Sequence, residues 1–163
     1  MKSWGNRPGE ISHLLNPAFC GEIIRRTLIA YQQKSETNLE FPLIYLVLPI
    51  TLHRETRERI ELSSRNKMHV WLQANQDIRI GFSERAKQLV PITNEAIQFL
   101  LNQRALEIGV EGDLRVTPYR RKKIEGYSSG EIQDIMKKAE KVGKWFSSAG
   151  TTSTIFTMWG VRP

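Results

Sequence analysis

The sequence lacks several features on which whole classes of protein depend. Its 163 residues include one cysteine, Cys20, and three histidines that lie far apart in the chain. One cysteine excludes an intramolecular disulfide and a cysteine-based zinc site, and no two histidines have the spacing of a helix-borne metal pair. A single thiol is typical of a reducing compartment, so we expect a cytoplasmic protein. Cys20 falls among apolar residues, and we predict a buried structural thiol.

Long apolar runs and nucleotide-binding loops are missing as well. No stretch reaches the roughly 18 apolar residues that a membrane-spanning helix needs. The first residues have no apolar core after their positive charge, so we expect no signal peptide. Neither a Walker-type loop nor a G-x-G-x-x-G motif occurs, and no carboxylates cluster as metal ligands. We therefore predict a protein with no catalytic residues, no metal site, no cofactor and no membrane segment.

The chain does carry an ordinary apolar content and a surplus of positive charge. Apolar residues make up 40 %, charged residues 25 %, and the net charge is +7. These values are typical of one globular domain. Residues 115–144 hold nine Lys and Arg against four Asp and Glu, so most of the surplus lies in this window. A polyanion is therefore a possible class of partner.

Helical patterns cover most of the chain after an irregular segment at 1–15. Asn16 and Pro17 are a good N-cap and first-turn pair, and they predict a helix from Pro17 to about Gln33. An apolar stripe from Trp71 to Leu89 predicts helix with a weak point at Gly81, ended by Pro91. A further helix is expected to reach Arg104. The last long helix is predicted at about 129–148, within a single domain at 16–163.

Two segments are less regular. Residues 41–53 are almost continuously apolar and include Pro42 and Pro49, so periodicity cannot separate a strand from a buried helix. Residues 105–117 alternate apolar and polar side chains around Gly112, which predicts a short β-hairpin. The predicted fold class is mainly α with this hairpin. Helix, turn, helix and hairpin is also the order of a winged-helix unit, although several unrelated folds share it.

Two charged patterns have different predicted roles. Glu55, Glu58 and Glu61 alternate with three arginines, which favours a solvated helix face with ion pairs. Four consecutive cations follow Tyr119, and three lysines recur at helical spacing farther on. These are the candidates for contact with nucleic-acid phosphates, with a solvated surface as the alternative. They are Arg120, Arg121, Lys122, Lys123, Lys137, Lys141 and Lys144.

The C-terminal residues are unusually apolar. They either pack into the core of the chain or dock on a partner, since Trp, Met and Arg are enriched at interfaces. The candidates for a partner interface are Ile155, Phe156, Met158, Trp159, Val161 and Arg162.

The order of several motifs resembles a known family. These motifs are Asn16-Pro17-Ala18-Phe19-Cys20, residues 41–53, Trp71-Leu72, residues 82–86, Thr154-Ile155-Phe156 and Trp159-Gly160-Val161-Arg162-Pro163. In this order they resemble the small middle component of bacterial three-component ABC systems, which include Lamassu-type phage defence. The likeness spans about residues 16–163, whereas residues 1–15 and the basic run after Tyr119 lie outside it.

The resemblance implies a non-enzymatic adaptor in an anti-phage complex. Such a component is expected beside a coiled-coil ATPase of the chromosome-maintenance or Rad50 type and an effector such as a nuclease. It is expected to help restrain the effector and to aid sensing of DNA. The resemblance also favours a buried helix, kinked at Pro49, for residues 42–53. The alternative function is a stand-alone winged-helix transcriptional regulator, which would need a dimer and a helix that reads the major groove.

Overall fold

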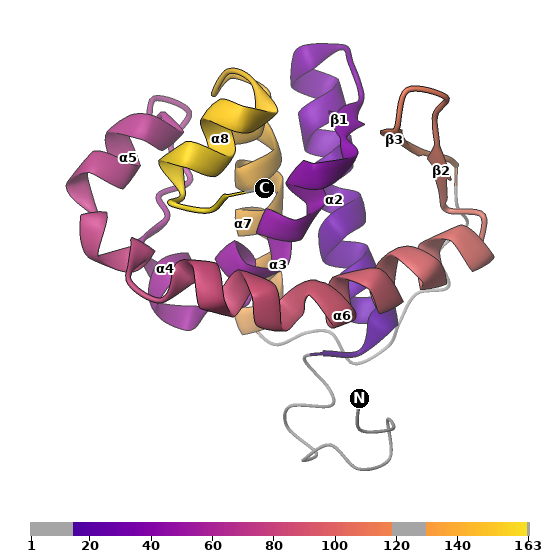
Figure 1. Cartoon of the computed structure of the whole chain (residues 1–163), viewed down its shortest axis with the longest axis horizontal. Helices are drawn as coiled ribbons and strands as arrows, with labels where there is room; N and C mark the ends of the chain where they lie inside the picture. The colour runs from indigo at the N-terminus through magenta and orange to yellow at the C-terminus, as the bar shows by residue number, and fades with distance from the viewer. Residues whose placement is uncertain (1–14, 119–129, 163) are drawn as a thin grey trace.

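The computed structural model describes residues 15–118 and 130–162, and these residues form mainly helices with one small antiparallel sheet (Figure 1). The predicted fold class is therefore confirmed. The irregular structure predicted for 1–15 falls almost wholly outside the described residues. The helices are α2 (Pro17–Ser35), α3 (Ile44–Thr51), α4 (Arg54–Arg59), α5 (Met68–Ala74), α6 (Phe82–Asn102), α7 (Gly130–Phe146) and α8 (Thr152–Met158), with short 3-10 turns η2 (Phe41–Leu43) and η3 (Gln76–Arg79).

The start of α2 follows the sequence signal closely. The side chain of Asn16 accepts a hydrogen bond from the Ala18 amide at 2.8 Å, and Pro17 occupies the first turn. The helix ends two residues later than predicted. There Glu36 adopts a left-handed conformation, and its amide donates to the carbonyl of Gln32.

Residues 41–53 form helix rather than strand. The 3-10 turn η2 leads into α3, which contains Pro49 and is buried on nearly every face. It packs against α2, α6 and α7. Because the whole circumference of α3 is covered, its sequence has no polar face, and this explains why periodicity could not identify it.

The predicted end of a helix at Pro91 is wrong. Gly81 does mark a break, with a left-handed conformation just before α6, but α6 then runs unbroken from Phe82 to Asn102. Proline removes the hydrogen bond to the carbonyl four residues earlier, here that of Lys87. Lys87 is on the exposed side of α6, where water can hydrate this carbonyl, while Ile92 and Thr93 are buried beyond the proline.

The predicted hairpin is present as β2 (Leu106–Ile108) and β3 (Asp113–Val116). A third strand, β1 (Leu39–Glu40), pairs with the other edge of β3, so the strand order is β1-β3-β2. No local pattern in the sequence indicates β1. The winged-helix comparison is not confirmed, because the two helices expected before the hairpin are one continuous α6 that runs along one side of the molecule (Figure 1).

The closest helix pair joins the two ends of the chain. α2 and α7 run in the same direction, with Thr27 Oγ1 donating to the carbonyl of Ala139 at 3.1 Å and Arg26 bonding Glu140 at 2.9 Å. Gly143 of α7 lies directly on the α2 backbone. A methyl group at this position would collide with the Thr27 carbonyl oxygen and lie 3.0 Å from the Tyr31 amide nitrogen. The absence of a side chain at 143 therefore sets the helix spacing.

We expect Gly143→Ala to destabilise the chain. Neither neighbouring backbone atom can swing aside, so the helices must separate, at a cost of about 1–3 kcal/mol. Gly130→Ala in the same helix is the matched control, because nothing lies within 4 Å of a methyl group there. Urea unfolding followed by circular dichroism measures both variants. Equal stability of the two would contradict the close approach of α2 and α7.

Candidate partner and nucleic-acid interface

The structure separates the predicted phosphate-binding residues into three groups. Arg120, Arg121, Lys122 and Lys123 lie outside the described residues. Lys137 and Lys144 are exposed on α7, as a phosphate contact requires. Lys141 was expected to share their face, but its side chain is buried.

Lys141 holds a neighbouring loop. Its ammonium group donates to the carbonyl of Ser63 at 2.6 Å and to that of Asn66 at 3.0 Å. Trp145, one turn later, donates from its indole nitrogen to the same Asn66 carbonyl at 2.6 Å. Burial lowers the pKa of Lys141, and the nearby positive charges of Lys34 and Lys144 lower it further. Lys141 is therefore a structural cation that fixes the segment at 61–67 against α7.

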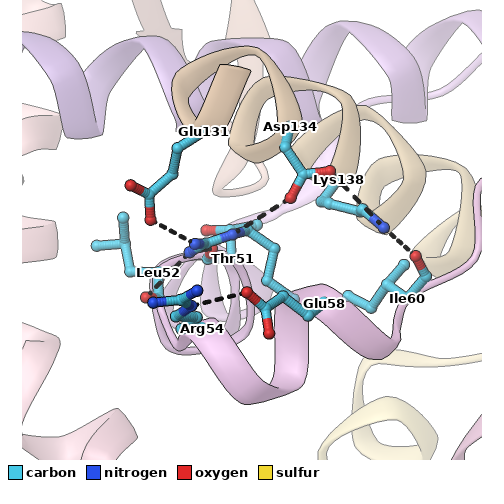
Figure 2. Close-up of polar contacts among 9 residues, drawn as sticks. Thr51, Leu52, Arg54, Glu58, Ile60, Glu131, Asp134 and Lys138 are labelled. Atoms are coloured by element: carbon cyan, nitrogen blue, oxygen red, sulfur yellow. Dashed lines mark hydrogen bonds and ion pairs between the residues drawn. The ribbon is translucent and has the colours of Figure 1, made fainter. Parts of the chain in front are cut away.

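A second buried cation joins α4 to α7 (Figure 2). One terminal nitrogen of Arg57 donates to the carbonyls of Thr51 and Leu52 at 3.1 and 3.3 Å, at the end of α3. The other donates to Glu131 at 2.8 Å, and Nε lies 3.4 Å from Asp134 Oδ2 without a hydrogen bond. The arginine thereby ties α3, α4 and the first turn of α7 together.

Lys138 completes this contact. Its ammonium group donates to the carbonyl of Ile60, just after α4, and lies 3.8 Å from Asp134. The Arg57 cluster is defined here as Arg57, Glu131, Asp134 and Lys138. The carbonyl groups at the C-terminal ends of α3 and α4 thus face cations. This arrangement is favourable, because the C-terminal end of a helix carries a partial negative charge.

The prediction that the alternating charges of α4 form ion pairs on a solvated helix face is correct for only part of the helix. Arg54 pairs with Glu58 at 2.7 Å, and Arg59 pairs with Glu55 and with Asp77 at 2.7 Å each, all near the surface. Arg57 differs, since only 3 % of it is exposed. Charge alternation could not reveal this, because the covering helix α7 lies more than 70 residues farther along the chain.

The apolar C-terminal residues pack largely into the chain itself. Ile155, Phe156 and Trp159 are buried, Met158 and Val161 are half-buried, and Arg162 is exposed. The structure therefore shows self-packing for three of the six residues of the predicted interface. Thr152 at the start of α8 also bonds Glu40 at 2.6 Å, which ties this helix to the end of β1.

Four aromatic side chains, Trp159 among them, form one cluster. The Trp159 ring lies 4.7 Å from Phe82 and 6.1 Å from Trp71 between centroids, and Trp71 in turn lies 5.0 Å from Trp145. The four residues come from α5, α6, α7 and the chain end. Among the described residues, the Trp159 indole nitrogen is buried without a hydrogen-bond acceptor. This aromatic cluster closes the core at one end of α6.

Cys20 is fully buried on α2, as predicted. Within residues 15–118 and 130–162, no three His, Cys, Asp or Glu side chains come together as metal ligands. In the same ranges no helix has the length and apolar character to cross a membrane.

The comparison with known families decides what kind of subunit this is. Residues 4–163, nearly the whole chain, match the family described as ABC-three component (ABC-3C) system Middle Component 3. The chain belongs to this family. As a middle component it is one part of a multi-subunit system, so it has partner subunits. No curated protein and no solved structure matches this middle component.

Proposed function

We propose that this middle component is a non-enzymatic adaptor in an anti-phage ABC three-component complex. It bridges a coiled-coil ATPase of the chromosome-maintenance or Rad50 type to an effector such as a nuclease, and it helps to restrain the effector until DNA is sensed. The observation that carries this proposal is the family match over residues 4–163. ATP and any catalytic metal belong to the partner subunits in this scheme.

The chemistry of the described residues agrees with an adaptor. The buried cations Arg57, Lys138 and Lys141 bond backbone carbonyls and carboxylates of the chain, so they hold helices together. Their roles are structural. An adaptor needs such rigid joints, because it must hold two partners in a fixed relation.

Co-purification tests the proposal. The tagged chain is expressed with its native neighbouring genes, captured, and analysed by mass spectrometry, with the untagged chain as control. We expect stoichiometric recovery of a large coiled-coil ATPase together with an effector. Recovery of the chain alone, as a homodimer with bound DNA, would overturn the adaptor and favour the winged-helix regulator.

The absence of enzymatic activity is a separate part of the proposal. The purified chain is incubated with divalent metal and DNA, and we expect no turnover. Turnover that is lost on a point substitution in this chain would refute this part, whatever partners the chain recovers.

A further inference from the structure

Four exposed cations lie on the three segments that meet at the buried Lys141. They are Lys34, Arg65, Lys67 and Lys144, and we call them the basic end surface. None of the four forms an ion pair with another described residue. Lys34 lies in the last turn of α2 and Lys144 in the last turn of α7, while Arg65 and Lys67 lie in the segment that precedes α5.

The fold brings these residues together from three separate parts of the chain. α2 and α7 run in the same direction and touch at Gly143, so their last turns lie side by side. Gln33, next to Lys34, lines a surface depression of about 260 Å³ together with Lys144. Lys141 then fixes the turn at 63–66 through the Ser63 and Asn66 carbonyls, which places Arg65 and Lys67 at the same end.

Cations farther along α2 and on α4 are neutralised by carboxylates. Arg26 bonds both Glu22 and Glu140 at 2.9 Å, and Arg54 bonds Glu58 at 2.7 Å. The basic end surface and Lys141 together carry five positive charges. These charges are only partly offset by Glu36, by Glu61 and by the partial negative charges at the ends of two helices. Lys34 and Lys144 repel the charge of Lys141 and so lower its pKa, while Glu61 acts in the opposite direction. An anion here would relieve the repulsion.

We propose that the basic end surface binds the phosphate backbone of a DNA duplex without reading its sequence. Charged groups of lysine and arginine on separate segments can each contact a different phosphate of the backbone. Such contacts require distributed positive charges and no shaped pocket. A protein partner would need apolar anchors. Of the exposed large apolar side chains in the described ranges, only Leu62 belongs to this surface, while Val70, Ile80, Val90, Ile108 and Val110 belong to other segments.

The site differs from the basic run predicted from the sequence, and three of its four residues were not candidates there. It deepens the proposed function by giving this subunit a DNA contact of its own. It does not depend on which ATPase or effector is present, because the DNA contact is a property of this chain.

The experiment measures binding of the purified full-length chain to a labelled 30-base-pair duplex by fluorescence anisotropy between 50 and 200 mM salt. The test variant carries Lys34→Glu, Lys67→Glu and Lys144→Glu. Each phosphate contact contributes about 0.9 to the slope of log K against log salt, so the slope is expected to fall by about 2.7. We expect binding at 100 mM salt to weaken at least about tenfold, since the reversed charges also repel the phosphates.

The matched control carries Lys87→Glu, Arg115→Glu and Arg162→Glu, which change three exposed cations elsewhere and give the same net charge. We expect the DNA affinity of this control to fall less than about threefold. Its lower net charge weakens the nonspecific attraction to DNA, but no phosphate contact is lost. Circular dichroism confirms that both variants are folded. If the glutamates unfold the chain, the milder Lys34→Gln, Lys67→Gln and Lys144→Gln variant replaces them.

Three outcomes would overturn the proposal. Equal losses in test and control variants would show that net charge alone matters. Loss of DNA binding only on reversal of Arg120, Arg121, Lys122 and Lys123 would place the contact in the basic run instead. Unchanged DNA binding with loss of co-purified subunits would make the surface a protein interface. DNA binding and co-purification are measured separately. A negative result for DNA binding at this surface therefore does not decide the adaptor proposal, which co-purification tests.

Discussion

Replacing Arg57 with alanine is expected to destabilise the chain by about 3 kcal/mol, because it removes one partner from a buried ionic contact. The carbonyls of Thr51 and Leu52 lose their donor, and the end of α3 is left with unsatisfied acceptors. Glu131 and Asp134 are partly exposed and regain water, so the loss stays below that of a fully buried pair. For a chain of this length, this corresponds to a fall of roughly 10 °C in the unfolding midpoint.

Arg54→Ala provides the control within the same short helix. Arg54 also forms an ion pair, at 2.7 Å to Glu58, but its side chain is 79 % exposed. A pair as exposed as this one contributes little to stability, because water and salt screen the attraction. Thermal and urea unfolding of the two variants should therefore differ clearly. If Arg57→Ala and Arg54→Ala are equally stable, the Arg57 cluster does not hold α4 to α7.

Deleting residues 154–163 is expected to unfold the chain rather than only to release a partner. Ile155, Phe156 and Trp159 are buried, and removal of a single large aromatic side chain from a core costs about 3–5 kcal/mol. Loss of all three approaches the whole stability of a typical domain, about 5–15 kcal/mol. Circular dichroism should show loss of helix, and tryptophan fluorescence should shift to longer wavelength as Trp71 and Trp145 meet water.

Two point variants refine this second prediction. Trp159→Ala is expected to destabilise the chain by about 3–5 kcal/mol, whereas Arg162→Ala, at an exposed position, should leave stability within about 0.5 kcal/mol. A deletion variant that stays folded but no longer recovers partner subunits would instead place the C-terminal anchors at an interface. A variant that stays folded and fully assembled would rule out both roles.

Local signals predicted the elements that depend on local chemistry. The Asn16 cap and Pro17 located the start of α2, and alternation around Gly112 located the hairpin. The same reasoning failed at Pro91. There, burial of Ile92 and Thr93 against the rest of the chain outweighs the preference of proline for a helix end.

Features that depend on distant residues could not be predicted from the sequence. β1 is two residues long and exists because it pairs with β3, so no local pattern identifies it. Arg57 and Lys141 look like surface cations in the sequence, and only the contact between α7 and the 51–66 region shows that they are buried. The basic end surface could not be predicted for the same reason, since its members come from three separate segments.

The pairing of α2 with α7 has a consequence for synthesis. The two helices are joined by hydrogen bonds between residues 112 and 114 positions apart. During translation α2 leaves the ribosome well before α7. The part of its apolar face that packs on α7 therefore stays uncovered until α7 has been made, although α3 and α6 can cover other parts earlier. Contacts of such long sequence separation slow folding, because a large loop must close before they form. The nascent chain therefore exposes part of the apolar face of α2 until α7 emerges, and early binding to a chaperone would protect it from aggregation.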